Sequence, residues 1–169
     1  MQRIFEGSLR VHYGQAYVLP SDMYGLDLND SFAKQENGLC GAATTGALFL
    51  ITGQHTGDVG FALDIAEAAP SIDDKWEEIV EVPLKIFRTE IHLQIWGGEK
   101  ICKLPLAPGW YRARYCAFDM QLGQESDGDD GIVDQYYLVI WPEDPPKKDK
   151  AIKVTSEIAR YWHDNAQSI

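Results

Sequence analysis

The sequence has few cysteines and no long hydrophobic run, and these shortages exclude several kinds of protein. Its three cysteines are Cys40, Cys102 and Cys116, which cannot all pair within one chain. The longest apolar run, near residues 47–51, is far too short to span a bilayer. Residues 1–6 lack the apolar stretch of a signal peptide. We therefore expect a cytoplasmic protein with reduced thiols, with one internal disulfide as the alternative.

The sequence also lacks the short motifs of common cofactor and catalytic sites. It has no phosphate-binding glycine loop with its lysine, no dinucleotide-binding fingerprint and no Gly-x-Ser-x-Gly elbow. No two histidines stand at metal-ligand spacing, and no Cys-x-x-Cys occurs. We expect no cofactor, no metal and no catalytic residue, and predict that the protein is not an enzyme. The alternative is a catalytic site that the fold assembles around Cys40 or a histidine, although the small apolar neighbours of Cys40 favour a buried thiol.

One Asp- and Gly-rich stretch, residues 127–131, looks at first like a calcium-binding loop. Counting back from Gly131 in the EF-hand pattern places Ser126, Gly128 and Asp130 in the three ligand positions, and Tyr137 takes the position of the required Glu. The EF-hand pattern therefore fails. A solvated loop and a weak calcium site of another geometry stay open as alternatives.

Positive charge is scarce as well. The chain has 15 Lys and Arg against 26 Asp and Glu, which gives a net charge of −11 and a pI near 4.7. Like-charge repulsion argues against nucleic acid and against an anionic membrane as partners. The same charge permits a basic protein partner, although acidity that serves only solubility would look the same.

Acidic residues are concentrated in two blocks, and the first contains no Lys or Arg from Ala117 to Pro146. The second runs from Asp64 to Glu81 and contains only Lys75 as a base. Such segregation steers a basic partner, and solvated loops between strands are the alternative. Tryptophan is enriched at binding hot spots, although it is also ordinary core. We predict these partner-binding residues: Glu125, Asp127, Asp129, Asp130, Asp134, Trp110 and Trp141.

Apolar and polar residues alternate with period two along most of the chain, which is typical of half-buried strands. Leu9, Val11 and Tyr13 share one face of the first strand. Residues 47–52 and 59–65 are predicted to form a hairpin, and Gly97-Gly98 a second hairpin turn. Pro83 indicates an edge strand or a bulge, because proline lacks the amide donor. Residues 20–38 are expected to form a polar loop.

The end of the chain adds one helix to this pattern. Thr155 or Ser156 is a suitable N-cap, and Ile158, Tyr161 and Trp162 are spaced to dock on a sheet. We therefore predict an all-β fold, a two-sheet antiparallel β-sandwich with a short C-terminal helix. Residues 1–169 are expected to form a single domain, with residues 142–169 as a C-terminal extension.

A Leu-x-Pro-Gly-x-Tyr motif at residues 106–111 is typical of β-sandwiches, where the tyrosine packs at a corner. With Gly46-Ala47-Leu48-Phe49, Val80-Glu81-Val82-Pro83-Leu84-Lys85-Ile86 and Leu104-Pro105, this motif resembles the competence protein J family of small nuclease inhibitors. The resemblance covers roughly residues 41–120. It implies an acidic single-domain protein that neutralises a nuclease, as an immunity protein does. The long acidic loop and residues 142–169 depart from the family, so its contact residues are not transferred.

Two functions follow as hypotheses. The first is an acidic cytosolic inhibitor or immunity protein that neutralises a basic enzyme, such as a nuclease or toxin. The second is a β-sandwich that binds a small ligand or carbohydrate on Trp110 or Trp141. In that case Arg112 and Arg114 would hold an anionic group, unless both arginines pair with acids on a neighbouring strand.

Overall fold

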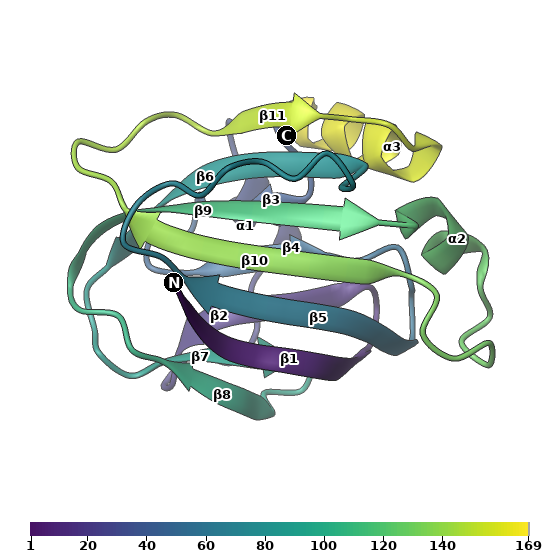
Figure 1. Ribbon diagram of the computed structural model, residues 1–169, viewed down its shortest axis with the longest axis horizontal. Coiled ribbons are helices and arrows are strands. Elements are labelled where there is room, and N and C mark those ends of the chain that lie inside the picture. The colour runs from purple at the N-terminus through teal and green to yellow at the C-terminus, as the bar shows by residue number, and fades with distance from the viewer. Residues whose placement is uncertain (169) are drawn as a thin grey trace.

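The computed structural model describes residues 1–168 and folds them into two β-sheets packed face to face (Figure 1). Ile169, the last residue of the predicted extension, lies outside the described residues. The larger sheet has the order β1 (Gln2–Val11), β5 (Gly57–Ile65), β10 (Gln135–Pro142), β9 (Gly109–Phe118), β6 (Glu78–Ile86) and β11 (Lys150–Lys153). The smaller sheet has the order β3 (Cys40–Gly41), β4 (Leu48–Ile51), β2 (Gln15–Pro20), β7 (Ile91–Ile95) and β8 (Lys100–Leu104).

The predicted sandwich is confirmed, and its larger sheet is mixed. Neighbouring strands run antiparallel except β5 and β10, which run parallel. These two strands are far apart in the sequence, so no tight turn forces them to run in opposite directions.

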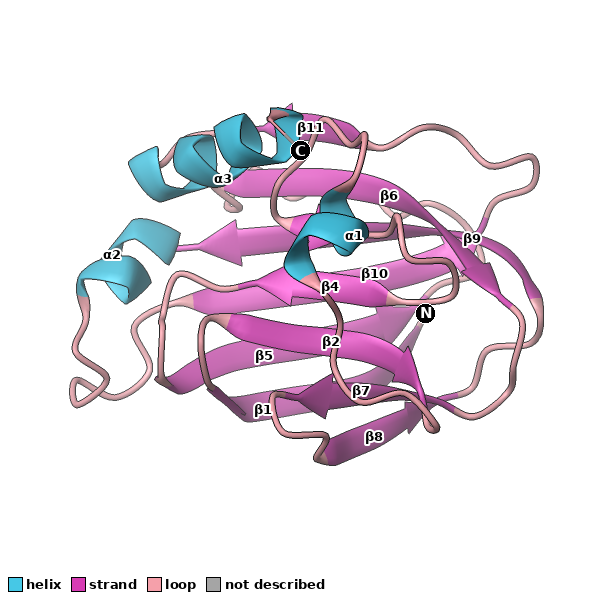
Figure 2. Ribbon diagram, turned by 180° about the vertical axis from the view of Figure 1, so that it is seen from behind, coloured by secondary structure: helices cyan, strands magenta, loops and turns pink. Residues whose placement is uncertain are grey.

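Three helices complete the described chain: α1 (Leu28–Phe32), α2 (Met120–Glu125) and α3 (Glu157–Gln167). α1 lies over the outer face of the smaller sheet, and α3 lies beside β6 and β11 (Figure 2). The predicted C-terminal helix is confirmed with Ser156 as its N-cap, whose hydroxyl accepts the Ala159 N–H at 3.2 Å. Ile158 and Trp162 pack against the core as predicted, whereas Tyr161 is exposed and Ala159 and His163 are buried instead.

The core lies between the two sheets and follows the alternation in the sequence. In β6 every second side chain from Val80 to Ile86 is buried, and Glu81, Pro83 and Lys85 are half-buried between them. Each fully buried Val, Leu or Ile side chain contributes roughly 1.5–3 kcal/mol. A hydrogen bond also joins the sheets, because the buried Tyr115 hydroxyl of β9 donates to the Ile51 carbonyl at 2.9 Å.

The predicted hairpin between residues 47–52 and 59–65 is wrong. β4 pairs with β2 and β3 in the smaller sheet, whereas β5 pairs with β1 and β10 in the larger one. The connecting loop, residues 52–56, crosses from one sheet to the other. Alternation within a strand cannot distinguish these two pairings, because both bury the same side chains.

Three smaller predictions have clear outcomes. The hairpin turn at Gly97-Gly98 is confirmed, and both glycines have a positive φ, of 93° and 87°. The tyrosine corner is confirmed, because the Tyr111 hydroxyl donates to the Ala107 carbonyl at 2.8 Å. Residues 20–38 are not all loop, because they contain α1. Asp27 is the N-cap of this helix and accepts the Asp30 N–H at 2.9 Å.

Pro83 lies in β6, which stands between β9 and β11 in the larger sheet. β6 pairs with β9 along its length, whereas β11 covers only its first part, Ile79–Glu81. In the described structure, the half of β6 that contains Pro83 therefore has a strand on one side only. This arrangement accommodates a residue without an amide donor.

Candidate protein-binding end

Four connections meet at the end of the sandwich opposite the N-terminus, on the right in Figure 1. They are the β1–β2 turn (12–14), the β4–β5 loop (52–56), the β7–β8 turn (96–99) and the segment from β9 to β10 (119–134). Backbone hydrogen bonds join the first two: the Gly14 N–H donates to the His55 carbonyl at 2.7 Å, and the Thr52 N–H donates to the Gly14 carbonyl at 2.9 Å. We call this surface the loop end.

An exposed aromatic cluster occupies one side of the loop end. It consists of His12, Tyr13, His55 and Trp96. The Tyr13 ring lies 4.9 Å from the Trp96 ring and 5.3 Å from the His55 ring, measured between centroids. Tyr13 is 56% exposed and Trp96 is 47% exposed. Large aromatic side chains in such positions are typical anchors of protein interfaces.

Sequence reasoning missed this cluster. Alternation placed Tyr13 on the buried face with Leu9 and Val11, but β1 ends at Val11 and Tyr13 has a positive φ of 57° in the following turn. Trp96 did leave a signal in the sequence. It falls on the same parity as the polar His92 and Gln94, out of step with the apolar positions of its strand.

The acidic loop, residues 125–131, lies next to this cluster. Glu125, Asp127, Asp129 and Asp130 are exposed. Gly128 packs so closely on the β4–β5 loop that an added Cβ would lie 2.4 Å from the Thr56 carbonyl oxygen. The acidic loop and the aromatic cluster therefore both contact the β4–β5 loop, at the neighbouring residues Thr56 and His55.

Asp134 has a different role from the other predicted acids. It is completely buried, and its Oδ2 accepts the Tyr136 hydroxyl at 2.6 Å and the Gln54 N–H at 3.3 Å. Burial raises the pKa of its carboxyl group, although both hydrogen bonds act in the opposite direction. The prediction that Asp134 contacts a partner is corrected: Asp134 anchors the end of the acidic loop to the β4–β5 loop.

The two predicted tryptophans do not lie at the loop end. Trp141 is 4% exposed, with the Arg114 guanidinium 5.1 Å above its ring. Seven residues of extended chain separate it from Asp134, a distance of about 23 Å. Trp110 is half-buried at the start of β9, with Lys85 Nζ 5.1 Å from its ring centroid. Closeness in sequence was misleading here, because β9 and β10 carry both side chains to the opposite end.

The structure decides between the two interpretations of Arg112 and Arg114. Glu81 on the neighbouring strand accepts from Arg112 Nε at 3.1 Å and from Arg114 Nε at 2.8 Å. Arg112 also donates to the carbonyls of Lys147 and Lys148, at 2.7 and 2.8 Å. Both guanidinium groups are nearly buried and occupied, so they hold the fold together and do not present a site for an anionic ligand.

Other candidate sites are structural as well. Cys40 is completely buried, and burial raises its pKa far above the range of a reactive thiol. Burial likewise raises the pKa of Cys116 to about 12.

Across residues 1–168, no three His, Cys, Asp or Glu side chains gather in a way that suits a metal ion. None of the helices described is both long and apolar enough to cross a membrane.

The fold and the loop end define a β-sandwich with exposed acidic and aromatic side chains at one end. No family model and no curated protein sequence matches the chain. Among solved structures, ComJ from Bacillus subtilis, an inhibitor of the DNA degrading activity of NucA, shares the fold with a TM-score of 0.57 at 18% identity. The match covers 84% of this chain and 98% of ComJ. The protein titled crocagin biosynthetic gene J shares it with a TM-score of 0.53 at 13% identity, over 85% of this chain and 99% of that protein. The predicted resemblance to competence protein J is thereby confirmed at the level of the fold.

Proposed function

We propose that this protein binds a basic enzyme, a nuclease in the first place, and inhibits it through the loop end. The observation that carries the proposal is that the acidic loop and the exposed aromatic cluster both contact the β4–β5 loop, at Thr56 and His55. A surface with rigid aromatic anchors and an acidic rim is suited to a positively charged protein. The shared fold with ComJ supports a nuclease as the enzyme.

The two parts of the loop end have different tasks in this proposal. The exposed carboxylates draw a basic partner from a distance and speed its encounter. They then take the positions that phosphates occupy in a nuclease, because carboxylates and phosphates accept the same charge-assisted hydrogen bonds from Arg and Lys. The aromatic cluster supplies apolar area that slows dissociation once the partner has docked.

A nuclease assay tests the proposal directly. DNA degradation is measured for NucA and for any nuclease encoded beside this chain, with and without the protein. A pull-down at low and at moderate salt identifies other basic partners. We expect inhibition at a stoichiometric ratio. If neither nuclease is inhibited and no basic partner is recovered at either salt concentration, the proposed function is wrong.

Charge variants then locate the surface. Asp127→Asn, Asp129→Asn and Asp130→Asn together should slow association and flatten its salt dependence, with little effect on dissociation. The matched control is Glu67→Gln, Asp73→Asn and Asp74→Asn, which removes the same charge from exposed positions of the second acidic block. Equal effects of both triple variants would mean that net charge alone acts. An effect confined to the control would place the interface on the second block.

A further inference from the structure

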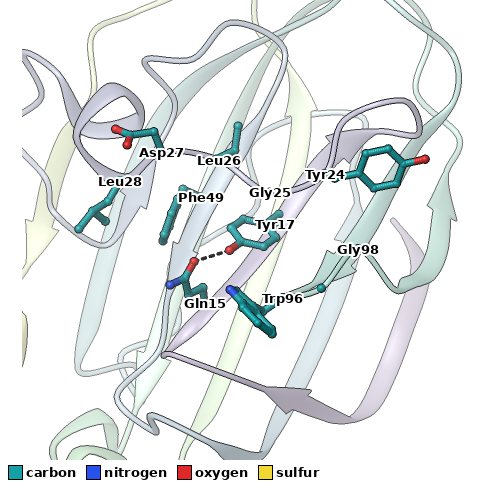
Figure 3. Close-up of a pocket in the computed structure, with 11 residues that line it drawn as sticks. Gln15, Tyr17, Tyr24, Gly25, Leu26, Asp27, Leu28, Phe49, Trp96 and Gly98 are labelled. Carbon is teal, nitrogen blue, oxygen red and sulfur yellow. Dashed lines mark hydrogen bonds between the residues drawn. The ribbon is translucent and has the colours of Figure 1, made fainter.

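A groove lies on the outer face of the smaller sheet. It has a volume of about 690 Å³, within the range of pockets that hold small ligands. Its floor consists of Gln15 and Tyr17 on β2 and Phe49 on β4, and the strand register places Tyr17 opposite Phe49. The segment between β2 and α1 forms one wall, and the β7–β8 turn forms the other (Figure 3).

The two ends of this groove differ in chemistry. Figure 3 shows Trp96 and Asp27 at opposite ends, with the floor between them. Tyr24 lies on the Trp96 side, because a Cβ on Gly98 in the same turn would lie 3.0 Å from the Tyr24 ring. Tyr24 is 76% exposed and Trp96 is 47% exposed, so both rings are open to a ligand. An occupant that contacts both ends therefore has to be elongated.

Hydrogen-bonding groups lie on the floor and at the Asp27 end. The Tyr17 hydroxyl donates to Gln15 Oε1, and the Gln15 amide nitrogen has no partner among the described residues. Asp27 is exposed, and its Oδ1 accepts the Asp30 N–H while its Oδ2 accepts no hydrogen bond in the described structure. The groove thus offers a donor along its floor and an acceptor at one end.

The charge of the groove argues against an ionic occupant. Asp27 is the one charged side chain among the described lining residues, and no Lys or Arg lines the groove. A phosphate or carboxylate would meet Asp27 without a cation to balance it, in a protein of net charge −11. A single cation that paired with Asp27 would leave the rings at the Trp96 end unused, because the floor separates them.

The position of the groove on a sheet face argues against an extended peptide. Peptides that add to sheets gain affinity from main-chain hydrogen bonds to an unpaired edge strand. β2 has β4 on one side and β7 on the other, so its backbone groups are already paired beneath the groove. Recognition here therefore depends on side chains.

A chain of neutral sugar rings has the chemistry that both ends require. A β-linked pyranose with equatorial hydroxyl groups has flat C–H faces, which stack on aromatic rings, and a rim of hydroxyl groups, which donate and accept hydrogen bonds. Successive rings repeat both features along an elongated molecule. One ring can therefore stack on an aromatic side chain while another bonds to a carboxylate farther along the groove.

We propose that this groove binds a neutral β-1,4-linked oligosaccharide, with one sugar ring on Trp96 and the hydroxyl groups of another bonded to Asp27. Tyr24 adds a second apolar surface at the Trp96 end, and the Gln15 amide donates to hydroxyl groups between the two ends. The site does not depend on the proposed function, because Tyr24 and Asp27 lie outside the loop end.

A glycan titration tests the inference. Cellohexaose is titrated while two-dimensional NMR follows the indole N–H of Trp96, assigned from its absence in Trp96→Phe. Xylohexaose and chitohexaose are titrated in the same way, and we expect at least one of the three to shift this resonance. If none of these neutral hexamers shifts it, the inference is wrong.

A charged probe tests the argument from charge. Cellohexaose oxidised at every C6 keeps the flat ring faces but carries a carboxylate on each ring. We expect it to bind more weakly than the neutral hexamers by about fivefold or more, because its carboxylates meet Asp27 and no cation. Tighter binding of the oxidised hexamer would overturn the assignment of a neutral ligand.

Calorimetry on aromatic variants locates the bound hexamer. Trp96→Ala should weaken binding by about fivefold or more, and Trp96→Phe, which keeps an aromatic face, should weaken it less. Tyr24→Ala should also weaken binding. Its matched control is Tyr161→Ala, which removes an exposed tyrosine of α3 outside the groove and should bind as the unchanged protein does. Equal losses in the two tyrosine variants would contradict a site in the groove.

The carboxylate end has a matched pair of variants as well. Asp27→Asn keeps the helix cap, because asparagine also caps helices, but it replaces a charged acceptor with a neutral one. It should weaken the bound hexamer by about threefold or more, because hydrogen bonds to charged groups are the stronger ones. Asp30→Asn removes an exposed carboxylate of α1 outside the groove lining and should leave binding unchanged. Unchanged binding in Asp27→Asn would overturn the inference.

Nuclease inhibition separates this inference from the proposed function. The double variant Tyr24→Ala with Asp27→Asn should lose the hexamer and keep inhibition, because neither residue belongs to the loop end. Hexamer binding by an unchanged protein that inhibits no nuclease would refute the proposed function alone. Inhibition by a protein that binds none of the hexamers would refute the groove alone.

Discussion

Glu81→Gln should destabilise the protein far more than removal of a surface carboxylate. Glu81 is 14% exposed and pairs with two guanidinium groups whose side chains are 4% and 8% exposed. Glutamine keeps one acceptor oxygen, but it leaves two nearly buried positive charges with only Glu143 nearby, at 3.8 Å from Arg112. Removing one partner of a buried pair costs about 3–5 kcal/mol, and the partial solvent access of Glu81 lowers the expected loss to roughly 2–4 kcal/mol.

The assay is urea and thermal unfolding beside a matched variant. Glu90→Gln breaks a salt bridge to Lys103 in which both side chains are more than half exposed, so it should change the free energy of unfolding little. For a domain of this size, the Glu81 variant should lower Tm by roughly 5–15 °C. Phosphate should restore part of this loss in Glu81→Gln alone, because only there are the guanidinium groups left unpaired. Equal unfolding free energies for the two variants would refute the structural role of the cluster.

Three further predictions concern buried groups. Gly38→Ala should lower the free energy of unfolding by roughly 2–4 kcal/mol and loosen α3, because its Cβ would lie 1.9 Å from the Trp162 carbonyl oxygen. In the control Gly131→Ala the added Cβ meets open space, so only the strain of the positive φ should reduce stability. Burial lowers the pKa of His163, whose Nδ1 accepts the Gly38 N–H. The unfolded chain therefore binds more protons than the folded one, and stability should fall as pH drops below about 6.5. Thermal unfolding of His163→Gln should lack this fall. Burial raises the pKa of Asp134, so its carboxyl group should reduce stability as pH rises from about 4, and Asp134→Asn should remove that decline in Tm between pH 4 and 7.

The sequence predicted what depends on neighbouring residues along the chain. Alternation located the strands around Val80 and Leu93, the Gly97-Gly98 turn follows from the freedom of glycine at positive φ, and Ser156 was one of two expected caps. Each of these features is fixed within a few residues. The sandwich itself also followed, because two half-apolar sheets have few ways to bury their apolar faces.

Pairing and burial over long distances could not be obtained in the same way. The loop from Thr52 to Thr56 was expected to close a hairpin, and only the partner strands show that it crosses between sheets. Asp134 looked like its acidic neighbours in sequence, but it is buried and accepts hydrogen bonds from the Tyr136 hydroxyl and the Gln54 N–H. Its position directly before β10 is the one local signal that separates it from the exposed acids.

The same buried contacts explain how an acidic loop could become a defined recognition surface. A loop that carries several like charges repels itself and gains little from its own hydrogen bonds. Here the segments on both sides of the loop are held together, because α2 packs so closely on Asp134 that a Cβ on Gly123 would lie 2.3 Å from its carboxylate oxygen. The middle of the loop is also held, because Gly128 rests on Thr56. The cost of holding the carboxylates together is therefore met by the folding of the sandwich, before any partner arrives. A partner that binds such a surface loses less conformational freedom in the complex, so preorganisation favours affinity.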